Sequence, residues 1–154
     1  MRKLLVAALM IGVIVFAACG GGDGDDDVQL PPGDEGEIQQ LIMDFVKAKV
    51  DADQDALVAT YSTQCAERVA QANLIISRWS RFREDVGLKV IGFDFDQLEA
   101  DFATGTPKAQ LIIEGLEPSD ASTLPVQVVK EDGAWKISTC GYNLPASAIP
   151  VDFQ

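Results

Sequence analysis

Apolar residues recur at intervals of three and four where the globular part of the chain begins. The first series comprises Ile38, Leu41, Ile42, Phe45 and Val46. Charged and amide side chains occupy most of the intervening positions, so one side of a helix would be apolar and the other polar. The pattern predicts an amphipathic helix from about Glu37 to Val50.

Two further helices are expected before the spacing of apolar residues changes from the helical period to the alternation of a strand. Asp53 or Asp55 can cap a short helix. The apolar residues of that helix are Leu57, Val58 and Tyr61. Ser62 or Thr63 can cap a third helix, which we expect to end near Phe82. Its predicted buried stripe consists of Ala66, Val69, Ala70, Leu74 and Trp79, with Ile75 or Ile76.

Alternation of apolar and polar residues begins after Gly87. Residues 88–95 predict a strand that carries Phe93 and Phe95 on one face. The chain then predicts either one more strand or a pair. These segments cover residues 101–104 and 108–114, with Gly105-Thr106-Pro107 as the break between them.

A hairpin follows. Residues 123–130 and 134–139 predict two strands, and Glu131-Asp132-Gly133 is typical of the tight turn that joins such a pair. The residues from 143 to 154 predict a C-terminal tail with two prolines. Helices followed by an antiparallel meander indicate an α+β fold, with the helices packed on one face of the sheet.

A family resemblance agrees with this order of elements. The hairpin from Pro125 to Ile137 resembles the closing hairpin of nuclear-transport-factor-like domains, the cystatin-like α+β cone that includes ketosteroid isomerase and polyketide cyclases. Residues 53–61, followed by Cys65, resemble the short-helix region of small bacterial lipoproteins with this fold. The resemblance implies one domain over residues 37–142, in which N-terminal helices pack on a curved antiparallel sheet.

In that fold the helices and the sheet enclose a cone-shaped pocket. The large side chains that are candidates to line it are Phe45, Tyr61, Trp79, Phe93, Phe95 and Trp135. The alternative is that these side chains simply fill the core. An apolar pocket with a few polar groups is the usual form of a ligand site, but the sequence does not show which of these residues face inward.

The N-terminus reads as a targeting segment. Two basic residues precede about fifteen mostly apolar ones, as in a secretory signal peptide over residues 1–18. Residues 16–19, Phe-Ala-Ala-Cys, resemble a bacterial lipoprotein box. The resemblance implies cleavage before Cys19, a diacylglyceryl group on its thiol and a fatty acyl chain such as palmitate on its amino group. The alternatives are an uncleaved membrane helix and an ordinary cleaved signal.

Residues 19–36 are rich in glycine and aspartate and contain a proline pair. Such a segment cannot bury apolar surface, so we expect a disordered acidic tether after the lipidated cysteine. The lipid would then hold the domain at the cell membrane or the outer membrane, on the extracytoplasmic side.

The net charge of the chain limits the classes of partner that it is expected to bind. The full chain carries a net charge of −12, and removal of the two basic residues of the leader makes the remainder more acidic still. This balance argues against nucleic acid, whose phosphates bind basic side chains. It also argues against an electrostatic attraction to anionic lipid, so the only expected contact with the membrane is the lipid on Cys19.

If Cys19 carries lipid, Cys65 and Cys140 are the remaining thiols. Outside the cytoplasm such a pair usually forms a disulfide. The alternative is a pair of unpaired buried cysteines. A bridge of this span would stabilise the fold by roughly 4 kcal/mol on the chain-entropy estimate.

Little in the sequence points to catalysis. The chain has no histidine, which excludes histidine bases and histidine metal ligands. Asp51, Asp53 and Asp55 resemble the start of a calcium loop, but Ala56 and Ser62 stand where that loop needs glycine and glutamate. We therefore expect no catalytic residue, metal or cofactor.

The expected function is a membrane-anchored, non-enzymatic binding or accessory module for a small apolar ligand or an envelope protein. A pocket filled by side chains would favour the protein partner. One alternative is an isomerase- or cyclase-like enzyme that uses a pocket carboxylate or tyrosine. The other is a structural component of the cell envelope.

Overall fold

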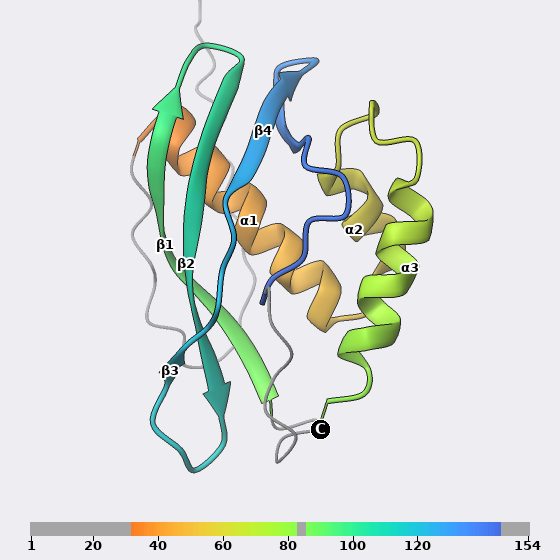
Figure 1. The fold of residues 1–154 in the computed structure, drawn as a ribbon, viewed down its shortest axis with the longest axis vertical. Coiled ribbons are helices and arrows are strands. Elements are labelled where there is room, and N and C mark those ends of the chain that lie inside the picture. The colour runs from red at the N-terminus through yellow and green to blue at the C-terminus, as the bar shows by residue number, and fades with distance from the viewer. Residues whose placement is uncertain (1–31, 83–85, 146–154) are drawn as a thin grey trace, which may run out of the picture.

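The computed structural model describes residues 32–82 and 86–145 (Figure 1). The predicted leader, Cys19, most of the predicted tether and the last nine residues lie outside this part of the chain. The helices are α1 (Asp34–Val50), α2 (Gln54–Thr60) and α3 (Arg68–Trp79). The strands are β1 (Val86–Leu98), β2 (Phe102–Ile113), β3 (Ser119–Asp120), β4 (Val126–Glu131) and β5 (Ala134–Ile137).

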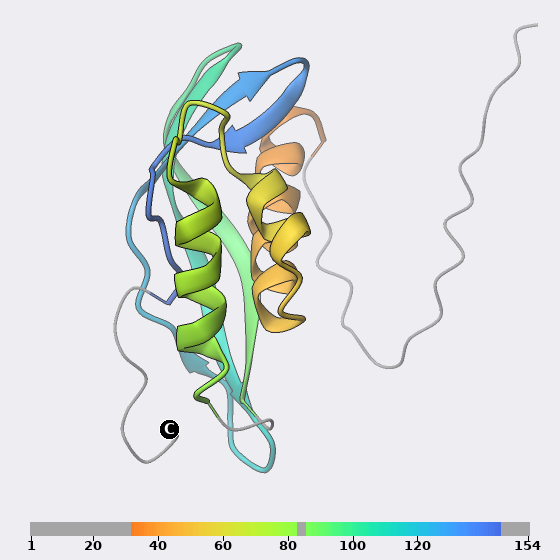
Figure 2. The same cartoon turned by 90° about the vertical axis from the view of Figure 1, so that its right-hand side faces the viewer.

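The three helices cover one face of a curved antiparallel sheet (Figures 1 and 2). The strand order is β1-β2-β4-β5, and the short β3 pairs with β2. The core lies between the two layers, where apolar residues of α1 and α2 meet those of β2, β4 and β5. This arrangement confirms the predicted α+β fold.

Helix α1 begins at Asp34, three residues before the predicted start. Its first turn carries three acidic residues and its last turn two lysines, an order that suits the helix dipole. Asp34 also accepts hydrogen bonds from Lys130 and Trp135 of the hairpin, at 2.6 and 3.0 Å. These contacts hold the first turn on the sheet, so residues 34–36 are helical and the prediction that they belong to the disordered tether is wrong.

The prediction for α3 is wrong in its start and in most of its buried face. The helix begins at Arg68. Ser62 and Thr63 donate instead to the carboxylate of Glu131, and these bonds hold the pKa of Glu131 below its ordinary value. The loop is thus tied to the hairpin, and α3 begins only after it.

The residues of α3 that pack inward are Ala72, Ile75 and Trp79. Of the predicted stripe, Val69 and Leu74 are 50% and 42% exposed, and Ala66 and Ala70 are exposed as well. Only Trp79 and the alternative residue Ile75 are confirmed as buried.

Strand β2 runs without interruption through the predicted break at 105–107. Gly105 pairs with Phe95, and an added Cβ there would lie 2.2 Å from the Phe93 ring and 2.3 Å from the Asp94 carbonyl oxygen. The glycine therefore permits a close approach of β1 rather than marking a turn. Register shifts in β1, between Val90 and Gly92 and between Phe95 and Gln97, add to the curvature.

The hairpin is confirmed. Strands β4 and β5 pair from Val128–Ile137 to Glu131–Ala134. Asp132 and Gly133 have φ values of 51° and 83°, as a two-residue type I′ turn requires.

The predicted disulfide is present. It joins Cys65, in the loop before α3, to Cys140, after β5, with their Cα atoms 5.5 Å apart. The prediction of a tail from residue 143 is wrong for its described part, because Leu144 and Pro145 are buried in the domain. No helix among the described residues is both long and apolar enough to cross a bilayer.

Candidate functional site

The interior of the cone contains aromatic side chains that pack on one another. The Phe45 ring centroid lies 5.9 Å from that of Tyr61, edge to face, and 5.5 Å from that of Tyr142. Phe93 and Phe95 stack at 4.6 Å and pack, partly buried, against the same core. Of the six predicted pocket residues, Phe45, Tyr61 and Trp135 therefore belong to this core, and Phe93 and Phe95 pack against it.

Trp79 belongs to a smaller cluster at the end of α3. Its ring lies 5.1 Å from that of Phe82, and Val86 completes the buried part. The sixth predicted residue thus packs apart from the other five.

Two of the residues that fill the cone were missed by sequence reasoning. Tyr142 and Leu144 enter it from the segment that follows the disulfide, and both are buried. The available signal was their position: two apolar residues close behind Cys140, which the bridge holds against the loop before α3.

Buried tyrosine hydroxyl groups occupy the same interior. The Tyr61 hydroxyl donates to the carbonyl oxygen of Tyr142 at 2.6 Å, and burial raises the pKa of Tyr61 above its ordinary value. The Tyr142 hydroxyl is buried without a hydrogen-bond partner among the described residues, and burial raises its pKa as well.

Lys49 is a third residue that sequence reasoning missed. It is only 2% exposed. Its ammonium group donates to Asn143 Oδ1 at 3.0 Å and to the carbonyl oxygen of Leu144, and it lies 4.6 Å from the Trp79 ring centroid. Burial lowers the pKa of Lys49 to about 7. The signal was the helical period, because Lys49 stands three and four residues after Val46 and Phe45, where the buried stripe continues.

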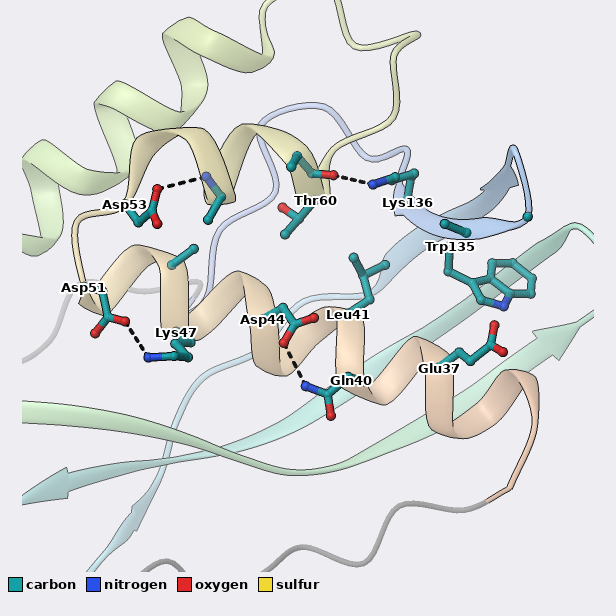
Figure 3. A pocket seen from close by; sticks show the side chains of 15 residues that line it. Glu37, Gln40, Leu41, Asp44, Lys47, Asp51, Asp53, Thr60, Trp135 and Lys136 are labelled. Carbon is teal, nitrogen blue, oxygen red and sulfur yellow. Dashed lines mark hydrogen bonds and ion pairs between the residues drawn. The ribbon is translucent and has the colours of Figure 1, made fainter. Parts of the chain in front are cut away.

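An open groove lies on the other side of α1, between that helix, α2 and the β4–β5 turn (Figure 3). Its volume is about 710 Å³. Four alanine residues of α1, α2 and β5 contribute to its lining. Of the six predicted pocket residues, only Trp135 lines it.

Charged side chains surround the groove. Its lining includes four carboxylates and two lysines, namely Glu37, Asp44, Asp51, Asp53, Lys47 and Lys136. Lys47 pairs with Asp51 at 2.6 Å, and Lys136 donates to the Ala59 carbonyl oxygen at 2.6 Å (Figure 3). Asp53 accepts from the Ala56 amide as the N-cap of α2. Acidic groups therefore outnumber basic ones in the groove.

Trp135 closes one end of the groove and is held firmly. Its indole N–H donates to Asp34 at 3.0 Å, and the Lys130 ammonium lies 5.3 Å from its ring centroid. The hydrogen bond from Lys130, with that from Trp135, holds the pKa of Asp34 below its ordinary value. The groove thus has a rigid aromatic wall.

The described residues contain no group of three histidine, cysteine, aspartate or glutamate side chains placed to hold a metal ion. Their buried polar side chains also include no carboxylate. The ionisable groups of the interior are therefore one lysine and two tyrosines.

Comparison with known proteins identifies the fold. No family description and no curated protein sequence matches the chain. A protein of unknown function with a cystatin-like fold from Nostoc punctiforme superposes with a TM-score of 0.56 at 18% identity, over 71% of this chain and 89% of that one. A putative dehydratase from the NTF2-like family of Streptomyces avermitilis gives 0.52 at 11% identity, over 68% and 90%.

A protein of unknown function from Mycobacterium tuberculosis gives a TM-score of 0.52 at 14% identity, over 66% of each chain. At these identities the likeness concerns the fold alone. The chain therefore has the cystatin-like, NTF2-like architecture that its sequence predicted.

Proposed function

We propose that this chain is an extracytoplasmic binding module, anchored to a membrane by a lipid on Cys19, and that it binds an envelope protein through the groove between α1, α2 and the β4–β5 turn. The observation that carries the proposal is the contrast in occupancy. The interior of the cone is filled by the chain's own Phe45, Tyr61, Tyr142 and Leu144, whereas the groove is open.

Electrostatics favours binding over the isomerase- or cyclase-like alternative. Such an enzyme needs a desolvated carboxylate or a reactive tyrosine facing a pocket. No carboxylate of the described residues is buried. The Tyr61 hydroxyl is already bonded in the core, and burial raises its pKa away from the range useful for a general base. The fold itself hosts both enzymes and binding proteins and does not decide.

The surplus of carboxylates in the groove gives the expected chemistry of the partner segment. Asp44 and Asp53 stand on opposite sides of the groove without a lysine paired to them among the described ion pairs. Opposite charge favours encounter and register in protein complexes. The partner segment is therefore one that carries lysine or arginine and is narrow enough to lie on the alanine surface.

The disulfide supports the proposed location. Bridges of this kind persist in oxidising compartments outside the cytoplasm. The acidic segment between Cys19 and the start of α1 would place the domain a short distance from the bilayer, with its groove free to meet a neighbouring protein.

A photo-cross-linking residue at Gln40, in the groove, tests the partner. A matched variant carries the same residue at Glu114, which is exposed and outside the groove. We expect one discrete adduct in cells from position 40, none from position 114, and loss of the adduct when Asp44→Lys is added. Equal labelling at both positions, or an adduct that survives Asp44→Lys, would exclude the groove as the binding surface.

Cys19→Ala tests the anchor separately. We expect the variant to lose its acyl chains and to leave the membrane fraction on cell lysis, measured by detergent phase partition and intact mass. A variant that still partitions with membranes would show that the lipid on Cys19 is not the anchor.

A further inference from the structure

The segment that closes the cone, residues 141–145, is here named the strap. Leu144 is fully buried and Tyr142 is 4% exposed, so the strap lies inside the domain. It is not a strand: β5 ends at Ile137, and among the described residues no backbone hydrogen bond joins residues 143–145 to the sheet. Side chains hold it in place instead.

Two side chains of the cone wall make the polar contacts to the strap. Tyr61 donates to the Tyr142 carbonyl oxygen. Lys49 donates to Asn143 Oδ1 and to the Leu144 carbonyl oxygen. The wall therefore presents donors, and the strap supplies three acceptor oxygens to them.

The strap contributes one side-chain hydroxyl group to the interior, that of Tyr142. The Tyr142 hydroxyl is buried and finds no acceptor among the described residues. Buried polar groups are almost always hydrogen-bonded, so an orphan of this kind calls for an explanation. The interior of this cone offers donors and an aromatic face but no acceptor at that point.

Among the described residues, no carboxylate forms an ion pair with Lys49. The other buried ionisable groups in the part of the chain that the structure describes are Tyr61, at the C-terminus of α2, and Tyr142 of the strap, both of which stay neutral at physiological pH. The Trp79 ring of α3 provides the only further stabilisation of the ammonium among the described contacts. A buried ammonium held by neutral oxygens alone is costly, and a carboxylate would compensate it better.

We propose that the interior of the cone is a second binding site, closed by the strap, for a small aromatic or aliphatic carboxylate that takes Lys49 as its cation and Tyr61 as a second donor. The apolar body of that ligand would replace Tyr142 and Leu144 against Phe45, and its two oxygens would replace the acceptors of the strap. This site is distinct from the groove, which lies on the opposite side of α1.

The covalent structure allows the strap to move without loss of the fold. The disulfide fixes Cys140, and Gly141 follows it with a φ of 79°, a conformation that favours glycine. A rotation at Gly141 would withdraw Tyr142 and Leu144 while the sheet and the bridge stay intact. The strap therefore acts as an internal occupant that competes with the ligand.

Calorimetric titration of the full-length protein tests the site. The probes are naphthalene-2-carboxylate and the isosteric neutral naphthalene-2-carboxamide. The loosened-strap variant is Asn143→Ala with Leu144→Ala, which keeps the bridge. We expect it to bind the carboxylate at least about ten-fold more tightly than the wild type does, and at least about ten-fold more tightly than it binds the carboxamide.

Lys49→Met in the loosened-strap background should remove this preference, with a loss of about ten-fold or more in affinity for the carboxylate. Lys108→Met is the control, because Lys108 is an exposed lysine of β2 in a pair with Asp94 and lies outside the groove. It should leave the affinity unchanged.

Equal affinity for the two probes, an unchanged affinity in Lys49→Met, or no gain on loosening the strap would each overturn the proposal. If the loosened-strap variant does not fold, Cys65→Ser/Cys140→Ser provides a second way to free the strap, and the same carboxylate preference and Lys49 dependence are required of it. The groove adduct at position 40 should persist in Lys49→Met, so the two proposals can fail independently.

Discussion

The two sides of helix α1 differ in polarity, in burial and in openness to solvent. The inner side is apolar, closed and fitted with buried donors, among them Lys49. The outer side is open, polar and acidic. Both belong to one helix, so a shift of two residues, from Lys47 to Lys49, moves an ammonium from solvent into the core. The comparison shows that side chains of both the helices and the segment after the last strand close the inner side, whereas the outer side stays open.

Truncation of neighbouring residues on α1 should show this contrast most strongly. Phe45→Ala removes a fully buried ring that contacts two tyrosines and should lower the free energy of unfolding by about 3–5 kcal/mol. Asp44→Ala removes an exposed carboxylate with one hydrogen bond to Gln40 and should change it by less than about 0.5 kcal/mol. Urea unfolding of both variants measures the two values, and similar losses would contradict the assignment of the two faces.

Trp135 belongs to both regions, because it packs in the core and forms one wall of the groove. Trp135→Ala should cost about 3–5 kcal/mol, since the ring is only 4% exposed and its N–H anchors the first turn of α1. A melting temperature equal to that of the wild type would mean that the ring faces water.

Removal of the Cys65–Cys140 disulfide should lower stability mainly through the interior of the cone. The bond closes a loop with a sequence separation of 75 residues, so Cys65→Ser/Cys140→Ser should lose about 2–5 kcal/mol of stability. Intact mass after alkylation without reductant checks the premise in the wild type. Two labelled thiols among Cys65 and Cys140 would show that the bridge does not form.

The pH dependence of stability should distinguish the two lysines. The pKa of Lys49 is about 7 in the folded chain and near 10.5 when unfolded, so the unfolded state binds more protons between these values. The free energy of unfolding should therefore rise with pH from 7 to 9.5, by on the order of 1 kcal/mol per pH unit. Tyr61 and Tyr142 keep their protons throughout this window.

Lys49→Met should remove that rise, and Lys47→Met should keep it. The pair with Asp51 raises the pKa of Lys47, so its charge does not change over the same window. Identical pH profiles for the wild type and Lys49→Met, measured by urea unfolding at each pH, would show that Lys49 is not buried as described.

Structural features that depend on local sequence could be predicted, and features that depend on distant contacts could not. The apolar stripe of α1, the change to strand periodicity and the Asp132-Gly133 turn are local signals, and they predicted these elements correctly. The start of α3 could not be predicted locally because distant contacts involve the expected caps: Ser62 and Thr63 donate to Glu131 instead of capping a helix.

The interior of the cone likewise combines features that local sequence predicts with features that depend on distant contacts. The aromatic residues of the core were recognisable, but the sequence did not show that the strap fills the space between them. The sequence predicts a break at Gly105, whereas the strand continues there and the missing side chain leaves room for Phe93. The burial of Lys49 follows from the helical period alone, since Lys49 continues the stripe of Phe45 and Val46.

Acetylation of the native protein tests the central contrast most directly. Mass spectrometry after brief treatment with acetic anhydride gives the modification rates of Lys47 and Lys49 in the same molecule. Because a lowered pKa makes an accessible amine more reactive, exposure of Lys49 would make it the faster of the two. The closed cone predicts rapid modification of Lys47 and modification of Lys49 only upon opening or unfolding, at a rate at least about ten-fold slower. Comparable rates, or a faster Lys49, would contradict the account.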